Sequence, residues 1–103
     1  MVLGIDKIYE LIRKKRVLSD LSERELKNPE GAGVDLRLGE LYSLSGSGFL
    51  GIEERHTPKA KLMAKYNPKK PKSFFLKPYQ YYIMTTVEPV NTPADILILF
   101  YPR

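Results

Sequence analysis

The sequence has 103 residues, a net charge of +5, 43% hydrophobic residues and no cysteine. This length allows a single domain over residues 1–103 with a modest core. The composition is typical of a globular chain. The lack of cysteine excludes a disulfide framework. No apolar run approaches the roughly 18 residues needed to cross a bilayer, and the N-terminus lacks a signal-peptide layout, so we expect a cytoplasmic protein that does not bind a membrane.

Residues 5–16 have the spacing of a short amphipathic helix. Ile5, Ile8 and Ile12 recur at helical intervals. An acidic residue in the first turn and four basic residues in the last turn suit the helix dipole. The pattern Ser-x-x-Glu at residues 22–25 predicts the capped start of a second, brief turn.

From Gly33 onward the hydrophobic period changes to two, which predicts a strand near residues 33–42. Asp35 and Arg37 would both project from the polar face of this strand. A carboxylate on a rigid strand could hold a magnesium ion directly or through water. It could equally form a cross-strand ion pair, and the spacing leaves both interpretations open.

The charge is distributed unevenly between the two halves of the chain. Residues 1–54 carry 8 Lys or Arg and 10 Asp or Glu, whereas residues 55–103 carry 9 and 2. We expect the second half to attract polyanions, which include nucleic acid, an acidic membrane surface and nucleotide phosphates.

Most of these basic residues lie in the basic tract, residues 55–77, which contains no acidic residue. Its prolines prevent a long helix and favour an exposed basic loop over residues 52–73. Aromatic residues are interleaved with the basic ones, so a surface that binds a single nucleic-acid strand is the less favoured interpretation.

Two further strands are expected near residues 74–87 and 95–101, because both stretches are rich in aromatic and branched apolar residues. The second is apolar on both faces, so it should lie between two layers or against another subunit. Short connections rich in proline and glycine favour antiparallel pairing. The sequence therefore predicts a mainly β fold, a distorted antiparallel barrel or sandwich with a short N-terminal helix.

The residue inventory excludes several metal-dependent and nucleophilic sites. The chain has one histidine, His56, and no cysteine, so neither a cysteine-based zinc site nor a three-histidine site can form. The histidine and cysteine ligands that zinc-dependent nucleobase deaminases require are also absent from this sequence. A serine–histidine triad would need a group that orients His56, and none lies nearby in the sequence, so we interpret His56 as a surface residue.

Three stretches together resemble the deoxycytidine triphosphate deaminase and dUTPase superfamily. They are "IDKIYELIRKKRVL" (5–18), "GAGVDLRLGE" (31–40) and "PVNTPADILILFYPR" (89–103). Val-Asp-Leu-Arg-Leu-Gly at 34–39 is similar to a strand of the deaminase members, and Ala-Gly-Val-Asp-Leu at 32–36 to a motif of the trimeric dUTPases. Pro102-Arg103 resembles the start of the family's Pro-Arg-Ser motif. The resemblance covers nearly the whole chain and is weakest between residues 40 and 73.

The resemblance implies a dUTPase-like β-clip fold, a homotrimer, and a role in pyrimidine deoxynucleotide metabolism with dCTP or dUTP as substrate. The reaction would be dCTP deamination, dUTP hydrolysis or both. Mg²⁺ would accompany the triphosphate, and no zinc would be used. Arg103 would contact the triphosphate through charge-assisted hydrogen bonds. Asp35 would orient a magnesium-bound water, and Arg37 would brace its strand.

The family's catalytic carboxylate follows the Pro-Arg-Ser motif, so the resemblance assigns no catalytic residue within this chain. We therefore expect an incomplete domain, either the N-terminal part of a longer enzyme or a degenerate relative. Two alternatives from other functional classes remain. One is a non-catalytic nucleic-acid-binding module that uses residues 55–77. The other is an interaction protein whose open strand near 95–101 pairs with a partner.

Overall fold

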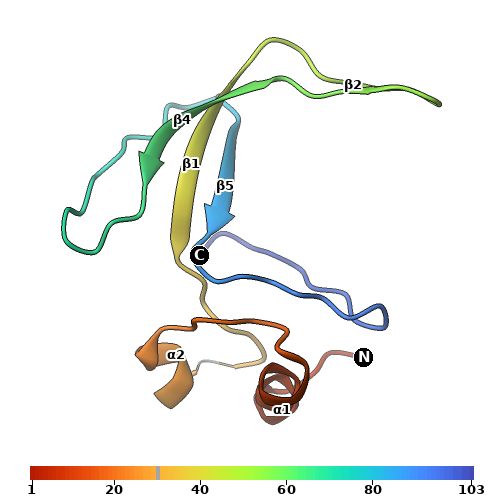
Figure 1. Ribbon diagram of the computed structural model, residues 1–103, viewed down its shortest axis with the longest axis vertical. Coiled ribbons are helices and arrows are strands. Elements are labelled where there is room, and N and C mark those ends of the chain that lie inside the picture. The colour runs from red at the N-terminus through yellow and green to blue at the C-terminus, as the bar shows by residue number, and fades with distance from the viewer. Residues whose placement is uncertain (30) are drawn as a thin grey trace. The chain divides into compact units, whose positions relative to one another are not determined.

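The structure is a computed structural model that describes residues 1–29 and 31–103, and within these residues the chain forms two helices and five strands. The chain contacts divide it into two compact units. Unit 1 consists of Met1–Arg37 and Glu88–Arg103, and unit 2 consists of Leu38–Val87. Each unit has its own arrangement of elements (Figure 1).

Unit 1 contains the helices α1 (Ile5–Lys15) and α2 (Glu23–Lys27). The predicted helix over residues 5–16 is therefore found, and it ends one residue earlier than expected. The reason is Arg16, which adopts a left-handed conformation with φ of 50° while its N–H donates to the carbonyl of Ile12 at 3.1 Å. This arrangement closes the helix, as left-handed caps commonly do.

The buried apolar residues of unit 1 come from the chain between its two helices. Val17 and Leu18 are 6% and 7% exposed. Leu18 forms an isolated antiparallel bridge with Val90, and the N–H of Asn91 donates to the carbonyl of Val17 at 2.8 Å. These bonds join the N-terminal part of unit 1 to the segment that follows residue 88.

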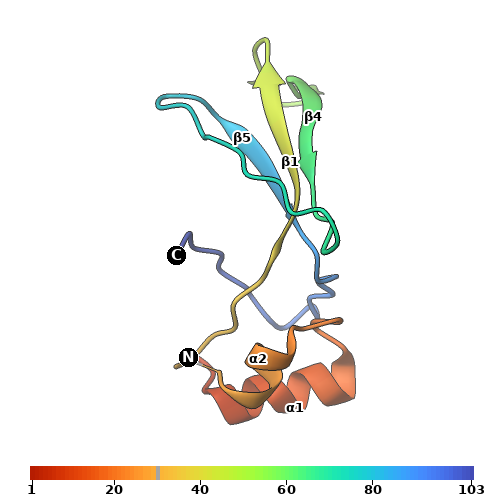
Figure 2. The same cartoon turned by 90° about the vertical axis from the view of Figure 1, so that its left-hand side faces the viewer.

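Unit 2 is built on a three-stranded antiparallel sheet in the order β4-β1-β5. The bounds are β1 Leu38–Ser45, β4 Lys59–Lys65 and β5 Tyr82–Thr86. Figures 1 and 2 both show β1 between the other two strands, which leaves β4 and β5 as the edges of this sheet. A second, two-stranded sheet pairs β2 (Phe49–Leu50) with β3 (Arg55–His56).

The centre of the sheet is packed most tightly around two residues of β1. Leu41 is 2% exposed. Gly39 lies so close to β5 that a Cβ atom there would be 2.9 Å from both the carbonyl carbon and the oxygen of Thr86. Residue 39 must therefore be small for β1 and β5 to pair at this point.

The strand expected near residues 33–42 begins later, at Leu38, and runs to Ser45. The alternating pattern that starts at Gly33 does not separate buried from exposed positions, because residues 34–37 are all half-buried, Leu38 is exposed and Gly39 is buried. The backbone N–H groups of Asp35 and Arg37 donate to glutamate side chains instead of a neighbouring strand. Residues 34–37 are therefore outside the sheet.

The other sequence-predicted strands also differ from the observed ones. The strand expected near residues 74–87 is limited to Tyr82–Thr86, because a turn at Pro78 and Tyr79, where Tyr79 has φ of 60°, interrupts the chain. No strand is formed by residues 95–101. From residue 95 to residue 99 the side chains alternate between exposed and half-buried, and residues 100 and 101 are both exposed, but no segment in the described part of the chain pairs with them. A strand requires such a partner.

The expectation of a basic loop over residues 52–73 is wrong in its central part, which forms β3 and β4. The prolines of this stretch lie outside the two strands, so they do not interrupt the sheet hydrogen bonds. The prediction of a mainly β chain with antiparallel strands and a short N-terminal helix is confirmed. Within the described residues the strands do not close into a barrel.

Candidate functional site

Two buried glutamates of unit 1 hold the segment that carries Asp35 and Arg37. Glu25 is 3% exposed, and its Oε2 accepts a hydrogen bond of 3.0 Å from the Asp35 N–H. Glu88 is 1% exposed, and its Oε2 accepts a bond of 2.9 Å from the Arg37 N–H. The two N–H groups are separated by one residue, as on one edge of an extended chain, so carboxylates take the place of a partner strand.

Arg37 connects three parts of unit 1 through its side chain. Its Nε donates to Glu88 Oε1 at 2.7 Å, and its Nη2 donates to the Asp20 carbonyl at 2.6 Å. Together with the backbone bond, this makes a two-point contact with one carboxylate. Charge-assisted bonds of this kind are stronger than neutral ones, so Arg37 has a structural role in fixing the segment.

The side chain of Asp35 points into a cluster of guanidinium groups. Its Oδ2 accepts a hydrogen bond from Arg103 Nη1 and lies 3.9 Å from Arg24 Nη1. The Asp35 side chain is 44% exposed, and those of Arg24 and Arg103 are about 60% exposed. The two site residues named from the sequence, Asp35 and Arg103, are thus brought together. We call Asp35, Arg24 and Arg103 the Asp35 cluster.

The Asp35 cluster carries one negative and two positive formal charges, and the buried carboxylate of Glu25, which accepts from the Asp35 N–H, lies beside it. Guanidinium groups are planar donors that match phosphate and carboxylate oxygens. This arrangement can hold an anion at the two arginines. Its carboxylate can accept a further donor on its exposed side.

The Asp35 cluster does not fit a resident metal ion, because the charges closest to its single carboxylate are cationic. Among residues 1–29 and 31–103, no group of three or more His, Asp or Glu side chains gathers to hold a metal. Divalent cations that proteins hold by themselves normally have several oxygen ligands.

The helix α2 contributes both Glu25 and Arg24 to the surroundings of Asp35. Ser22 caps this helix, with its Oγ accepting from the Glu25 N–H at 3.4 Å. The Tyr9 hydroxyl of α1 donates to the Glu25 carbonyl. Burial raises the pKa of Tyr9 above its usual value, and the charge of Glu25 raises it further, so Tyr9 remains a neutral donor at physiological pH.

Sequence reasoning did not identify Glu25, Glu88 or Arg24 as parts of this site. The Ser-x-x-Glu pattern at 22–25 did point to Glu25, but as the second half of a capping box, in which the carboxylate returns to the cap residue. The structure shows the Glu25 carboxylate bonded to Asp35 instead. Nothing in the local sequence around Glu88 signals its pairing with Arg37.

His56 lies on β3, opposite Phe49, and is exposed. It belongs to unit 2, whereas the Asp35 cluster belongs to unit 1.

Comparisons with known proteins agree with the motifs of residues 33–39 and 89–103. The family model of the dCTP deaminase-like domain matches residues 2–103. Neither the curated proteins nor the solved structures gave a match. Neither helix in the described residues has the length and apolar character needed to cross a membrane. The match extends over almost every residue and supports a role in pyrimidine nucleotide metabolism, and we conclude that the chain belongs to the dCTP deaminase-like family.

Proposed function

We propose that the protein binds a pyrimidine deoxynucleoside triphosphate, dCTP or dUTP, and takes part in the deamination of dCTP, the hydrolysis of dUTP, or both. The observation that carries the proposal is the ion pair between Asp35 and Arg103. These residues are 68 positions apart in the sequence, and both lie in the motifs that resemble the family's nucleotide site. Family membership supports the nucleotide class.

Arg103 is the proposed contact for the triphosphate. A guanidinium group carries five N–H donors, so it can hold the Asp35 carboxylate and contact a phosphate oxygen at the same time. Arg24 Nη1 lies 3.9 Å from the same carboxylate oxygen that Arg103 contacts. A phosphate that approaches Arg103 therefore meets a guanidinium group, and the charge-assisted hydrogen bonds that it forms there strengthen its binding.

The proposal includes Mg²⁺, which would bind together with the nucleotide phosphates. Mg²⁺ usually keeps several waters and is bound through one or two carboxylates together with substrate phosphates. Asp35 would contact it only through a water and only when the phosphates bring it, because the charges nearest to Asp35 are those of two guanidinium groups. The residues that perform the chemical step are not assigned to this chain.

A homotrimer is the proposed assembly, and the exposed apolar side chains near the C-terminus support it. Leu97 is 84% exposed, Leu99 64%, Phe100 61% and Tyr101 78%. These four exposed side chains fall within residues 97–101, and a contiguous apolar patch built from them would be typical of an interface. Sedimentation analysis tests this proposal, because a monomer at high protein concentration would contradict it. The cytoplasmic location expected from the cysteine-free composition is part of the same proposal.

The first experiment measures nucleotide binding and turnover in the presence of Mg²⁺. Calorimetry with dCTP, dUTP, dATP and dGTP should show preference for the pyrimidine nucleotides. Ammonia release from dCTP and pyrophosphate release from dUTP then separate deaminase from diphosphatase activity. Equal affinity for purine and pyrimidine nucleotides, or no affinity for any of them, would contradict the proposal.

Variants test the roles of the two residues. Arg103→Ala should weaken triphosphate binding by about 10- to 150-fold, because it removes a charge-assisted hydrogen bond. Arg13→Ala, which removes one exposed positive charge from α1, is the matched control and should bind normally. Asp35→Asn should lower the magnesium dependence of triphosphate binding. Unchanged binding together with a lower melting temperature would give Asp35 a purely structural role.

A further inference from the structure

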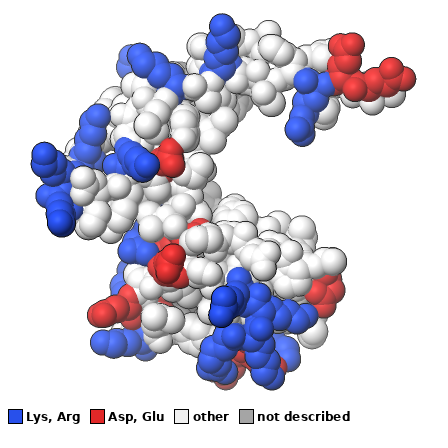
Figure 3. Space-filling view, in the orientation of Figure 1, with Lys and Arg blue, Asp and Glu red and all other residues white. Residues whose placement is uncertain are grey.

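Unit 2 has a lysine surface that the proposed nucleotide site does not use. Its lysines lie on β4 and on the loop that follows, and all of them are exposed. Figure 3 shows these basic side chains gathered over this part of the chain. We call six lysines of this edge the lysine surface: Lys59, Lys61, Lys65, Lys69, Lys70 and Lys72. Because the register shifts between Leu41 and Tyr42, Lys65 lies on the other side of the sheet from Lys59 and Lys61, so the lysines flank both sides of the β4 edge.

The positive charge of this surface is only slightly offset. Within the described residues none of the six lysines forms an ion pair. The nearest acidic residue in the sheet register is Glu40, which lies opposite Lys65 on β1. Its carboxylate accepts a hydrogen bond from the Tyr42 hydroxyl. The remaining lysines face solvent without a neighbouring carboxylate, so they attract anions.

Hydrogen bonds connect residues within the loop after β4 and join its end to β4. Asn67 accepts bonds from the N–H groups of Lys69, at 3.0 Å to its side chain, and of Lys70, at 3.2 Å to its carbonyl. The Lys72 Nζ donates to the Met63 carbonyl at 3.2 Å and so ties the end of the loop to β4. Lys69 and Lys70 are thus presented on an ordered turn.

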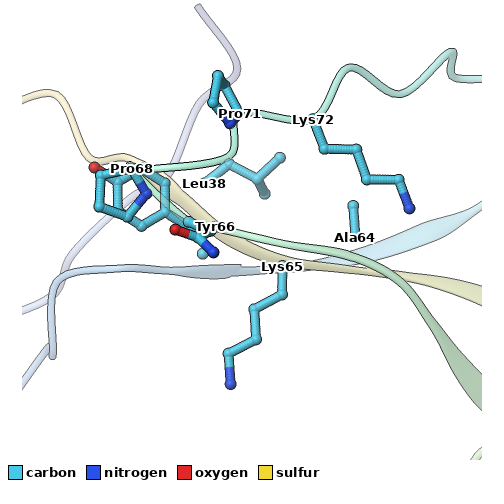
Figure 4. Close-up of a pocket in the computed structure, with 9 residues that line it drawn as sticks. Leu38, Ala64, Lys65, Tyr66, Pro68, Pro71 and Lys72 are labelled. Carbon is cyan, nitrogen blue, oxygen red and sulfur yellow. The ribbon is translucent and has the colours of Figure 1, made fainter.

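A pocket of about 470 Å³ lies between this loop and the start of β1. Its walls are Leu38, Tyr66, Pro68 and Pro71, and Lys65 and Lys72 also line it. Figure 4 shows Tyr66 and Pro68 close together, with the Lys72 side chain extending toward β4. Tyr66 is 44% exposed. The volume falls within the range of about 300–1,000 Å³ that is usual for ligand pockets.

We propose that the lysine surface and this pocket bind single-stranded nucleic acid, with backbone phosphates along the lysines and one base stacked on Tyr66. Single-strand binding combines a positively charged track with aromatic rings on which bases stack, and both features are present here. A membrane surface is a weaker fit. Basic membrane-binding elements are typically amphipathic helices with an apolar face, whereas these lysines lie on an edge strand and a turn.

The first test is the salt dependence of binding to a labelled oligothymidylate of about 15 nucleotides, near the upper limit of common site sizes. Each phosphate neutralised in a single strand contributes about −0.7 to the slope of log K against log salt. If at least three phosphates are contacted, affinity should fall about 20-fold or more between roughly 50 and 200 mM salt. A flat salt dependence would overturn the proposal.

Charge variants then locate the surface. Lys69→Ala combined with Lys70→Ala should reduce the magnitude of the salt slope by about 1.4, because two phosphate contacts are lost. Arg13→Ala combined with Lys15→Ala removes the same charge from the exposed end of α1 and should leave the slope unchanged. An equal effect of both pairs would show that only net charge matters and would overturn the assignment.

The stacking role has its own test. Tyr66→Leu keeps an apolar wall but removes the ring, and affinity should fall about 5- to 150-fold, the range measured for loss of a stacked base. Tyr81→Leu, at a tyrosine that is 84% exposed and outside the pocket, should bind like the unmodified protein. Equal losses in the two variants would contradict placement of a base in the pocket.

One competition experiment and two binding comparisons complete the test. Excess dCTP or dUTP with Mg²⁺ should not displace the oligonucleotide, because the proposed nucleotide site is in unit 1, and displacement would mean that one site accounts for both ligands. Duplex DNA of the same length should bind more weakly, because its bases are not available for stacking. Binding to vesicles that contain an anionic lipid, with no binding to the oligonucleotide, would overturn the proposal in favour of a membrane surface.

Discussion

The carboxylate of Glu88 accepts hydrogen bonds from both the backbone and the side chain of Arg37, 51 positions away in the sequence. Glu88 is 1% exposed, so this contact is buried at one end. It joins the segment that carries Asp35 to the segment that continues toward Arg103. The position of the Asp35 cluster therefore depends on a pair of residues that does not belong to the cluster.

Glu88→Ala should destabilise the protein strongly. The substitution removes the Glu88 carboxylate that accepts hydrogen bonds from the Arg37 N–H and guanidinium. Removal of one partner of a buried charged pair lowers the stability of the folded state. Because the Arg37 side chain is 36% exposed, we expect a loss of about 2–3 kcal/mol in the free energy of unfolding, toward the low end for such pairs. Denaturation with urea measures this loss.

Two further variants test whether loss of the hydrogen bonds to Arg37 causes the destabilisation by Glu88→Ala. Glu88→Gln keeps a side-chain oxygen that can accept one of the two bonds, so it should lose less stability than Glu88→Ala. Glu23→Ala removes an exposed glutamate from α2 and should change the stability by less than about 0.5 kcal/mol. If Glu88→Ala were as stable as Glu23→Ala, the pair with Arg37 would not hold the segment.

Glu25→Ala tests the second support of the Asp35 segment. The Asp35 N–H would lose its acceptor, which we expect to cost about 1–3 kcal/mol. Hydrogen exchange at the Asp35 amide should become much faster than in the unmodified protein. Ser22→Ala, which removes only the helix cap, is the control, and it should leave the Asp35 amide protected. Faster exchange in both variants would mean that loss of α2 alone explains the effect.

The sequence was sufficient for those features that depend on local pattern. The helix at residues 5–15 follows from its apolar spacing and charged ends. Asp35 and Arg103 were selected by their motifs and lie together. The partners Glu25 and Glu88 were not found, because each acts on a residue that is distant in sequence and a lone glutamate gives no sign of its partner.

The strand assignments show a different limit of sequence analysis. Residues 95–101 have a stronger apolar pattern than β4, yet only β4 forms a strand. A strand is defined by hydrogen bonds to a neighbour. The segment 59–65 has such a neighbour in β1, whereas none is present for 95–101 in the described residues. Local composition reports burial preference and does not report the presence of a partner.

The ion pairs of α1 predict a pH effect. Hydrogen bonds from Lys14 and then Lys7 hold the pKa of Glu10 below its usual value of 4.5. Because the pKa of Glu10 is lower in the folded state, the ionised form of Glu10 stabilises the protein at pH values above the usual pKa. This contribution is lost as the pH falls through the folded-state pKa.

Glu10→Gln should therefore lower the urea midpoint at a pH of about 6, and this difference should be smaller at a pH of about 3, because the stabilisation declines as the pH falls below the usual pKa and through the lowered one. Glu23→Gln is the control, since Glu23 is exposed and forms no ion pair in the described residues. An equal difference at both pH values would show that the charge of Glu10 is not the cause.

Gly39→Ala tests the close approach of β1 and β5. The new Cβ would lie 2.9 Å from the backbone carbon and oxygen of Thr86, and backbone atoms cannot rotate away as a flexible side chain can. The two strands must separate locally, which we expect to cost about 1–3 kcal/mol, the usual range for overpacking. Amide exchange along β5 should increase together with the loss of stability.

Gly33→Ala is the matched control for this substitution, because a Cβ at residue 33 has no atom within 4 Å and the residue does not have a positive φ. It should be neutral or slightly stabilising, since alanine restricts the unfolded chain more than glycine does. If Gly39→Ala behaved like Gly33→Ala, β1 and β5 would not be in contact at Thr86. The glycine at the end of the Val-Asp-Leu-Arg-Leu-Gly motif would then need a reason other than sheet packing.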